Sequence, residues 1–447
     1  MAVEMSEAAQ ARLEEAARAG VRRVRVHYSD LLGTTRAKVI PLDLLEEIAE
    51  GGIKFCVSVF AIDHTGVMPD GTGLRDEVQL RDMDVVPDLA TLRVVPWERE
   101  TAICLADCFF EGAALEADPR GILKRAVAEA ERAGLEIACG HELEFFLLRR
   151  TDNGGLEKYA PVPGLVYRLD PCVDPQGVIR AMEDAVRGLG LPFVCANQEY
   201  DSSQWEINCR YDDALQAADD AHLLKLAIKE IAAMNGLVAT FMGRPIDGGG
   251  TSGYHLHVSA WDGGTNVFED GSGPYGLSEL ARWFVGGVIE HARAMTPLMA
   301  PTINAYKRFF AQELAPYWID WGPDNRTVFV RIPAERGKAT RVECRGADGT
   351  ASAYLASAAA IFAGIDGVER RLDPGPPSTG VYEPPVERPT MPFSLAEALD
   401  ALEADPFMRE KLGEQFTRCF LTLKRNEVRR FALAVTDWEL REYLDAL

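Results

Sequence analysis

The first part of the chain mixes short alternating and helical patterns, which predicts a small α+β domain over residues 1–112. Val21–Tyr28 alternates between apolar and polar side chains and predicts a strand, and a second short strand ends at Pro41. The other expected elements are a helix over Leu42–Glu50, a strand over Phe55–Ile62, a loop over residues 63–90, and strands over Thr91–Pro96 and Thr101–Asp107.

A second domain is predicted over residues 113–447, where helices and alternating strands follow one another. Its first helix begins clearly, because Asp118 can cap the first turn and Pro119 suits the first helical position. Residues 373–393 are rich in proline and predict an ordered surface crossing without a helix. From Ser394 to Leu447 the pattern is helical again.

Composition limits the kinds of partner. The 447 residues include 47 Lys and Arg against 69 Asp and Glu, a net charge of −22. This acidity argues against nucleic acid and anionic membranes as partners, since both require a basic face. No segment has ~20 consecutive apolar residues, and Met1–Arg25 is typical of an amphipathic helix rather than a signal peptide. Nine scattered cysteines fit reduced thiols, so a cytoplasmic protein is expected.

Several strand-like runs carry a polar face, because residues two apart in a strand share a side of the sheet. Glu142 and Glu144 share one such face, and Glu206 alternates in the same way in its own run, with Glu199 a short distance upstream. The other runs place together His255, His257 and Ser259, and Arg341, Glu343 and Arg345. For any single run, a solvated face of a half-buried sheet is an equally good interpretation.

Taken as a set, the polar runs favour a metal site. Neighbouring Phe, Trp, Tyr and Leu residues leave little access to water, and burying unpaired carboxylates costs several kcal/mol. Divalent cations would remove that cost. Five Glu and one His without a thiolate suit Mg²⁺ or Mn²⁺ better than Zn²⁺. Six such ligands would fit two metal ions of the kind that bind transferring phosphoryl groups.

A second group of residues is cationic and lies near aromatic and apolar runs. Guanidinium groups suit carboxylates and phosphates, although surface salt bridges would explain each residue taken singly. The group comprises Lys307, Arg308, Arg326, Arg331, Arg341 and Arg345. Gly248–Gly253 formally satisfies GxGxxG but precedes an alternating strand instead of a helix, so a dinucleotide site is not supported.

Six motifs, in this order, resemble the glutamine synthetase family, and the resemblance covers nearly the whole chain. They are GHELEFF from Gly140, QEYDSSQWE from Gln198, SGYHLH from Ser252, NAYKR from Asn304, WG…NRT…RIP from Trp321, and RVECR…AYL from Arg341.

The resemblance implies an α+β fold, with an N-terminal β-grasp domain and a catalytic α/β domain built on a curved antiparallel sheet. It implies ATP and two or three Mg²⁺ or Mn²⁺ ions per site, with glutamate and a small amine as substrates. It also implies stacked rings of subunits, usually a dodecamer, with active sites between neighbours.

The same resemblance implies roles for individual residues. Metal ligands on the amino-acid side are Glu144, Glu199 and Glu206, and those on the ATP side are Glu142, His255 and Glu343. The nucleotide side includes His257, Ser259, Arg331 and Arg341, with Tyr211 beside the adenine. The residues that bind the glutamate carboxylates and the transferred phosphate are Arg308, Arg326 and Arg345.

The chain departs from the family where ammonium is handled. An Asp occurs in the relevant N-terminal stretch as Asp63, within FAIDHTG and not in the family's FDGSS. The catalytic flap acid is displaced by one position, as Glu313, and Leu314 stands in the usual place. We therefore expect an ATP-dependent γ-glutamyl-amide ligase whose acceptor is larger than ammonia, such as a polyamine, ethanolamine, methylamine or an aromatic amine. The alternatives are a glutamine synthetase proper that uses ammonia, and a non-catalytic structural or regulatory family member.

Overall fold

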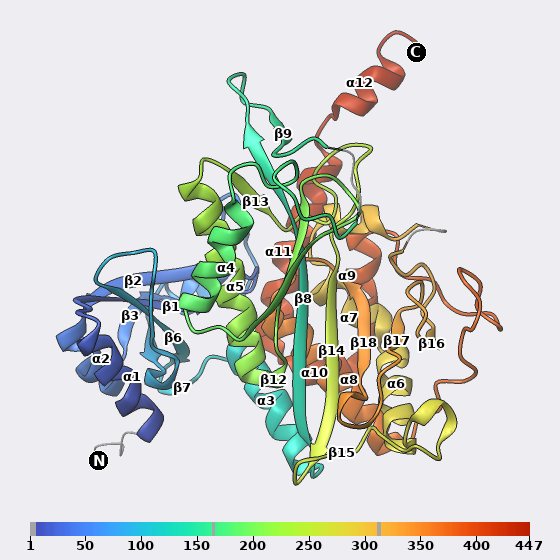
Figure 1. Cartoon of the computed structure of the whole chain (residues 1–447), viewed down its shortest axis with the longest axis horizontal. Helices are drawn as coiled ribbons and strands as arrows, with labels where there is room; N and C mark the ends of the chain where they lie inside the picture. The colour runs from blue at the N-terminus through green and yellow to red at the C-terminus, as the bar shows by residue number, and fades with distance from the viewer. Residues whose placement is uncertain (1–5, 163–165, 311–313) are drawn as a thin grey trace.

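The computed structural model describes residues 6–162, 166–310 and 314–447. Two β-sheets organise it, and the smaller sheet, near the N-terminus, lies beside a helix-covered larger one (Figure 1). The smaller sheet has the order β2-β1-β6-β4-β3, with β5 and β7 pairing to β6, and only β1 and β6 run parallel. Its strands are β1 (Arg23–Ser29), β2 (Thr35–Pro41), β3 (Ile53–Cys56), β4 (Asp82–Pro87), β5 (Arg93–Val94), β6 (Thr101–Phe110) and β7 (Ala113–Ala114). Helices α1 (Glu7–Arg18) and α2 (Leu45–Gly51) accompany it.

Two sequence predictions in this region are wrong. The strand expected over Phe55–Ile62 ends at Cys56, and Val57–Ala61 forms a 3₁₀ turn. The buried residues of this run recur every three positions, as in a 3₁₀ helix. A short run of apolar residues does not by itself distinguish such a turn from a buried strand. The segment 63–90, expected as a loop, contains β4, whose Met83 and Val85 are buried in alternation between acidic residues. Its Asp and Pro residues favour turns, but pairing to β3 and β6 makes this segment a strand.

The larger sheet confirms the predicted α+β class. It has the order β10-β11-β8-β14-β18-β17-β16, and its pairs are antiparallel apart from β16 with β17. The strands are β8 (Glu136–Arg150), β9 (Leu156–Lys158), β10 (Phe193–Gln198), β11 (Gln204–Cys209), β12 (Asp212–Asp213), β13 (Val238–Thr240), β14 (Tyr254–Asp262), β15 (Thr265–Asn266), β16 (Trp321–Pro323), β17 (Val330–Ile332) and β18 (Val342–Ala347).

The first helix of the larger body begins where the sequence indicates. Asp118 accepts a hydrogen bond from the Arg120 amide at the start of α3, as its capping pattern predicts. The helices are α3 (Pro119–Arg132), α4 (Val178–Gly188), α5 (Ala214–Met234), α6 (Glu279–Glu290), α7 (Ala292–Met299), α8 (Ala353–Arg370), α9 (Leu395–Ala404), α10 (Pro406–Leu412), α11 (Glu414–Ala432) and α12 (Asp437–Tyr443). The proline-rich crossing over 373–393 contains no helix, and the C-terminal helical prediction is confirmed.

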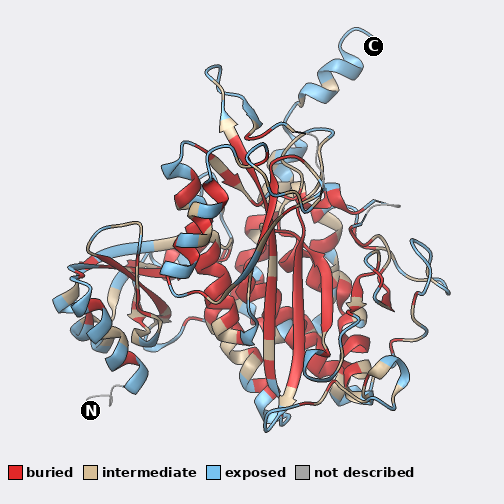
Figure 2. Cartoon of the chain, viewed as in Figure 1, coloured by how far each residue is buried: buried red, intermediate tan, exposed pale blue. Residues whose placement is uncertain are grey.

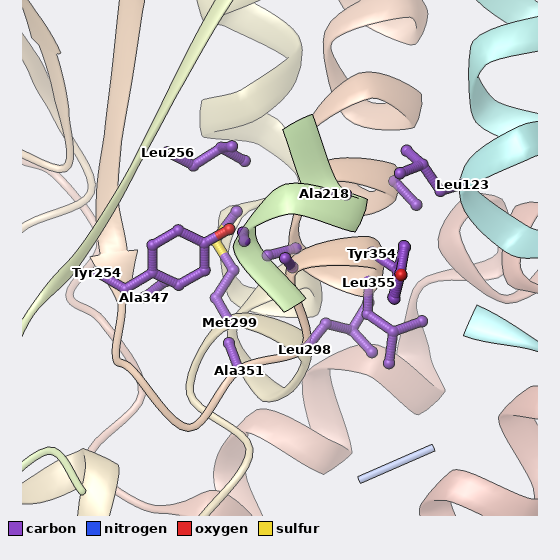
Figure 3. Packing of buried hydrophobic residues seen from close by; sticks show 14 of the residues in the cluster. Leu123, Ala218, Tyr254, Leu256, Leu298, Met299, Ala347, Ala351, Tyr354 and Leu355 are labelled. Atoms are coloured by element: carbon purple, nitrogen blue, oxygen red, sulfur yellow. The ribbon is translucent and has the colours of Figure 1, made fainter. Parts of the chain in front are cut away.

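The central strands have one apolar face that packs on helices. These strands and the helices behind them hold many of the buried residues (Figure 2). Tyr254 and Leu256 of β14 point toward this helical layer, where Ala218 of α5 and Leu355 of α8 lie (Figure 3). The intervening residues of β14 therefore project from the opposite face. Among the helices in the described ranges, none combines the length and hydropathy that a membrane crossing requires.

The buried Arg120 links the N-terminal sheet to the helices that pack on the larger sheet. The Arg120 guanidinium donates to Asp107 at 2.7 Å and to Asp88 at 2.9 Å, both in the N-terminal part, and to both oxygens of Asp219 on α5. The Tyr354 hydroxyl of α8 also donates to Asp219. Because a buried charge must be paired, this network fixes how the first sheet sits against α5 and α8.

A buried histidine connects three helical segments. His291, between α6 and α7, places Nδ1 2.7 Å from Asp405 and Nε2 2.9 Å from Asp366 of α8. Two carboxylates facing both ring nitrogens require both nitrogens to carry protons, so the ring is an imidazolium here. Burial opposes this charge, but the hydrogen bonds to Asp405 and Asp366 outweigh it and raise the pKa of His291 above 6.5.

Replacing His291 with Gln should destabilise the fold more at pH 6 than at pH 9. A raised pKa in the folded state gives stability that is present below about pH 6.5 and lost as the pH rises through the folded-state pKa. We expect a loss of about 1–3 kcal/mol at pH 6. Thermal unfolding of both proteins across this range measures it, and a difference independent of pH would contradict a charged clamp.

Candidate active site

The register of the antiparallel strands brings the predicted site residues together on one face of the larger sheet. Directly paired residues of neighbouring strands share a face, and their Cβ atoms lie about 4.5–5.5 Å apart. The paired positions form three rows: Glu206 with Glu144; Asn208, Glu142 and His255; and His257, Glu343 and Arg331. Residues from widely separated parts of the sequence thus form one polar surface opposite the apolar core.

Two groups of side chains within this surface have the spacing of metal sites. Ligand atoms of Glu142, Glu206 and His255 lie within 4.8 Å of one another, as do those of Glu142, His257 and Glu343. Carboxylate oxygens and imidazole nitrogens without a thiolate fit Mg²⁺ or Mn²⁺. The grouping differs from the predicted one, because Glu142 belongs to both groups and His257 joins the second.

The carboxylates on the predicted ATP side are already paired with basic groups. Glu142 lies 2.8 Å from His257 Nε2 and 3.2 Å from His255 Nδ1. Glu343, which is 0% exposed, contacts Arg331 at 2.6 Å and also pairs with Arg345. Burial opposes ionisation of Glu343, but the nearby His257, His255, Arg345 and Arg331 outweigh it and lower its pKa to about 2.

The carboxylates on the predicted amino-acid side have mainly neutral partners. Glu144 accepts from the Gln204 amide at 2.8 Å and from the Gly253 backbone at 2.7 Å. Burial, together with neighbouring carboxylates, raises the pKa of Glu206 to about 9 and that of Glu199 to about 7. No Lys, Arg or His nitrogen of the described chain lies at ion-pair distance from Glu199 or Glu206, although Arg326 partly offsets the charge of Glu199, and a cation would stabilise this half of the site.

A cavity of about 300 Å³ opens beside the ATP-side carboxylates. Among the predicted nucleotide-side residues, its lining includes Tyr211, His257, Ser259 and Arg341. Arg341 donates through Nε to His257 Nδ1 at 3.1 Å, and the Tyr211 ring is largely exposed. Arg331 does not line the cavity, because it pairs with Glu343 and with Asp324.

The three predicted carboxylate- and phosphate-binding arginines occupy different environments. Arg308 is 3% exposed and donates to the Ala347 carbonyl, with no carboxylate at ion-pair distance in the described chain. Arg345 pairs with Glu343 and donates to the Arg326 carbonyl, while the Arg326 side chain is exposed. A buried guanidinium whose acidic neighbours, Asp348 and Glu144, do not reach ion-pair distance suits an anionic substrate. Glu313, predicted on the flap, lies outside the described residues.

Asp63 has few free lone pairs. Its Oδ1 accepts from the Thr65 backbone, the Thr65 hydroxyl and the Val67 backbone, at 2.8, 2.7 and 3.1 Å. Its Oδ2 lies 3.2 Å from Arg430 and 3.3 Å from the Asn426 amide of α11. With 5% exposure and this set of donors, Asp63 caps a turn within its own subunit.

Sequence reasoning did not identify the amides that contact the carboxylates. Gln204 donates to Glu144, Asn197 to Glu199, and Asn208 to Glu206. The two-residue spacing of Asn208 from Glu206 could have revealed one of these partners, because it places both side chains on the same face of β11.

Comparisons with known proteins agree with this geometry. The family described as "Glutamine synthetase, catalytic domain" matches residues 116–443. Glutamine synthetase of Thermotoga maritima is 35% identical, with 95% of this chain and 96% of that protein covered. Glutamine synthetase of Methanosarcina mazei is 33% identical, with 97% of each covered. A solved structure titled "GmaS/ADP complex-Conformation 1" is 32% identical with a TM-score of 0.86, covering 97% of this chain and 99% of that one.

Fold, site and comparisons together define an ATP-dependent ligase that forms carbon–nitrogen bonds. The chain belongs to the glutamine synthetase family. Its family membership, fold and enzyme class therefore confirm the expectations from sequence, whereas the individual residue roles remain predictions.

The crowded carboxylates should lower the stability of the metal-free protein and favour the binding of a cation. Replacing Glu206 with Gln keeps the shape and removes a carboxyl group whose ionisation the site opposes, so the metal-free protein should gain about 1–3 kcal/mol. The gain should grow from pH 5 to pH 9, because over this range the carboxyl group ionises in the unfolded chain while its raised pKa keeps it protonated in the folded chain. The increase in Tm on adding Mn²⁺ should shrink at the same time.

Differential scanning fluorimetry with EDTA or Mn²⁺ measures both effects. Glu157→Gln, on the exposed strand β9, is the matched control and should leave both values unchanged. A variant with lower metal-free stability and an unaltered response to Mn²⁺ would contradict the account of the site.

Proposed function

We propose that this enzyme activates glutamate with ATP and joins it to an amine larger than ammonia, which yields a γ-glutamyl amide. The main support for an amine larger than ammonia is the bonding of Asp63, because both oxygens of its carboxylate already contact donors of the same chain. An acid used in this way has little capacity left for an ammonium ion. Leu314, in the place usual for the flap acid, supports the same conclusion.

The proposed binding roles follow the two sides of the site. Two or three Mg²⁺ or Mn²⁺ ions, when bound, would neutralise the phosphate charge of ATP. The proposed protein ligands are Glu142, Glu144, Glu199, Glu206, His255 and Glu343, and His257 is close enough to join them. The proposed nucleotide-side residues are Tyr211, His257, Ser259, Arg331 and Arg341.

The proposed reaction has two steps. An oxygen of the glutamate γ-carboxylate attacks the γ-phosphorus of ATP, the bond to the ADP oxygen breaks, and γ-glutamyl phosphate forms. The amine nitrogen then attacks the acyl carbon, phosphate leaves, and the nitrogen loses a proton. Arg308, Arg326 and Arg345 would bind the carboxylates and the transferring phosphoryl group, whose charge they offset. Glu313 is the proposed flap acid that receives the proton.

The proposed assembly is a homo-oligomer, a dodecamer with sites between neighbouring subunits.

A glutamine synthetase that uses ammonia is the second candidate function. The names of the curated relatives favour it, since those at 33–35% identity are called glutamine synthetases. The two candidates share every step except the identity of the amine.

Measuring phosphate release against a panel of amines separates the two candidates. We expect turnover to require ATP, Mg²⁺, glutamate and an amine, and kcat/KM for the best primary amine to exceed that for ammonia by at least about tenfold, or 1.4 kcal/mol. If ammonia is the best acceptor, the enzyme is a glutamine synthetase proper. Mass spectrometry of the product identifies the amide formed.

Arg345→Ala and Glu144→Ala should each reduce kcat by at least about 100-fold, because each removes a group that faces charge in the phosphoryl transfer. The circular dichroism spectrum should stay that of the wild type. Arg149→Ala, on the exposed end of the same strand β8, is the control and should retain full activity. Near-wild-type turnover in either site variant would exclude its proposed role.

A further inference from the structure

Two asparagines lie between the acidic side chains of the site. Asn197 on β10 is paired with Glu206 on β11, and Asn208 on β11 is paired with Glu142 on β8. Each asparagine also contacts an acid of its own segment. The Asn197 amide donates to Glu199 Oε1 at 2.8 Å, and the Asn208 amide donates to Glu206 Oε1 at 2.7 Å. The polar face therefore alternates neutral amides with carboxylates.

These amides are the side-chain donors to Glu199 and Glu206 within the described chain. Neither carboxylate has a Lys, Arg or His nitrogen at ion-pair distance there, in contrast to Glu142 and Glu343. An arginine in the same place would neutralise the acid and compete with a metal ion. An amide donates a hydrogen bond without supplying a full positive charge, so the carboxylate keeps its attraction for a cation.

We propose that Asn197 and Asn208 are positioning residues that hold Glu199 and Glu206 ready for a divalent cation. Each amide holds Oε1 of its carboxylate, and Oε2 would coordinate the cation. The orientation exists before the cation arrives, so less rotamer freedom is lost on binding. This inference rests on the proposed ligand roles of Glu199 and Glu206, and it adds the residues that orient them.

The inference predicts an effect on only one side of the site. Glu142 and Glu343 are oriented by histidine and arginine, so losing an asparagine amide should leave nucleotide binding unchanged. Asn197 gives the cleaner test, because Asn208 also lines the nucleotide cavity. Loss of an outer hydrogen-bond partner of a metal ligand typically weakens metal binding about 10–100-fold.

The experiment compares Asn197→Ala and Asn197→Leu with the wild type. Leucine keeps the side-chain volume and removes the hydrogen-bond donor. Equal weakening of Mn²⁺ binding in both variants would therefore assign the effect to the lost hydrogen bond and not to lost packing. Electron paramagnetic resonance of free Mn²⁺ gives the number and affinity of bound ions, and fluorescence titration gives the affinity for ADP. We expect Mn²⁺ binding at one class of site to weaken at least about tenfold, with ADP affinity within about twofold of wild type.

Gln216→Leu is the matched control, because the Gln216 amide donates to Asp220 at 2.8 Å on α5, away from the site. It should leave Mn²⁺ and ADP binding unchanged. Asn208→Leu is the second variant and should also weaken Mn²⁺ binding, so the inference stays testable if Asn197 variants fold poorly by circular dichroism.

Two outcomes would overturn the inference in different ways. Wild-type Mn²⁺ affinity in the asparagine variants, with Mn²⁺ binding lost in Glu206→Gln, would refute the positioning role alone. Absence of Mn²⁺ binding by the wild type would refute the ligand roles on which the proposed function depends, and the positioning role with them.

Discussion

The site depends on the cost of burying like charges on one face of an antiparallel sheet. The register of β11, β8, β14 and β18 puts Glu206 beside Glu144 and His257 beside Glu343. The opposite face of the same strands packs on α5 and α8, so the sheet cannot turn these acids toward bulk water without exposing its core. Every other feature of the site serves to offset the resulting repulsion.

The protein offsets that repulsion differently on the two sides. Arginine and histidine pair with Glu343 and Glu142, which keeps these carboxylates ionised. Glu206 receives a hydrogen bond from a neutral amide and keeps a raised pKa, which burial and the surrounding acids cause. The carboxylates of the first side are balanced by basic residues of the chain, whereas those of the second side would be balanced by a bound cation. One continuous polar surface therefore has a half whose carboxylates are paired with basic residues and a half whose carboxylates contact neutral amides.

Much of the architecture could be predicted because local patterns agreed with the tertiary result. Asp118 caps α3 as expected, and the alternation around Glu142 and His255 identified strands with one polar face. The errors fell where local signals conflict with pairing. Val57–Ala61 is as apolar as a strand but forms a 3₁₀ turn, and β4 contains acidic residues yet lies inside the first sheet. In both places neighbouring strands decided the conformation.

The sequence by itself determined which residues are candidates for the chemistry, because it places acids, imidazoles and guanidiniums at the two-residue spacing that puts them on one strand face. Only the tertiary structure decided which of them meet. Strand register joined Glu142 to both ligand groups and brought His257 to Glu343. Chain folding likewise turned Asp63 toward Arg430, which lies far away in sequence. Contacts between distant segments depend on register and packing, and spacing within one segment contains no information about either.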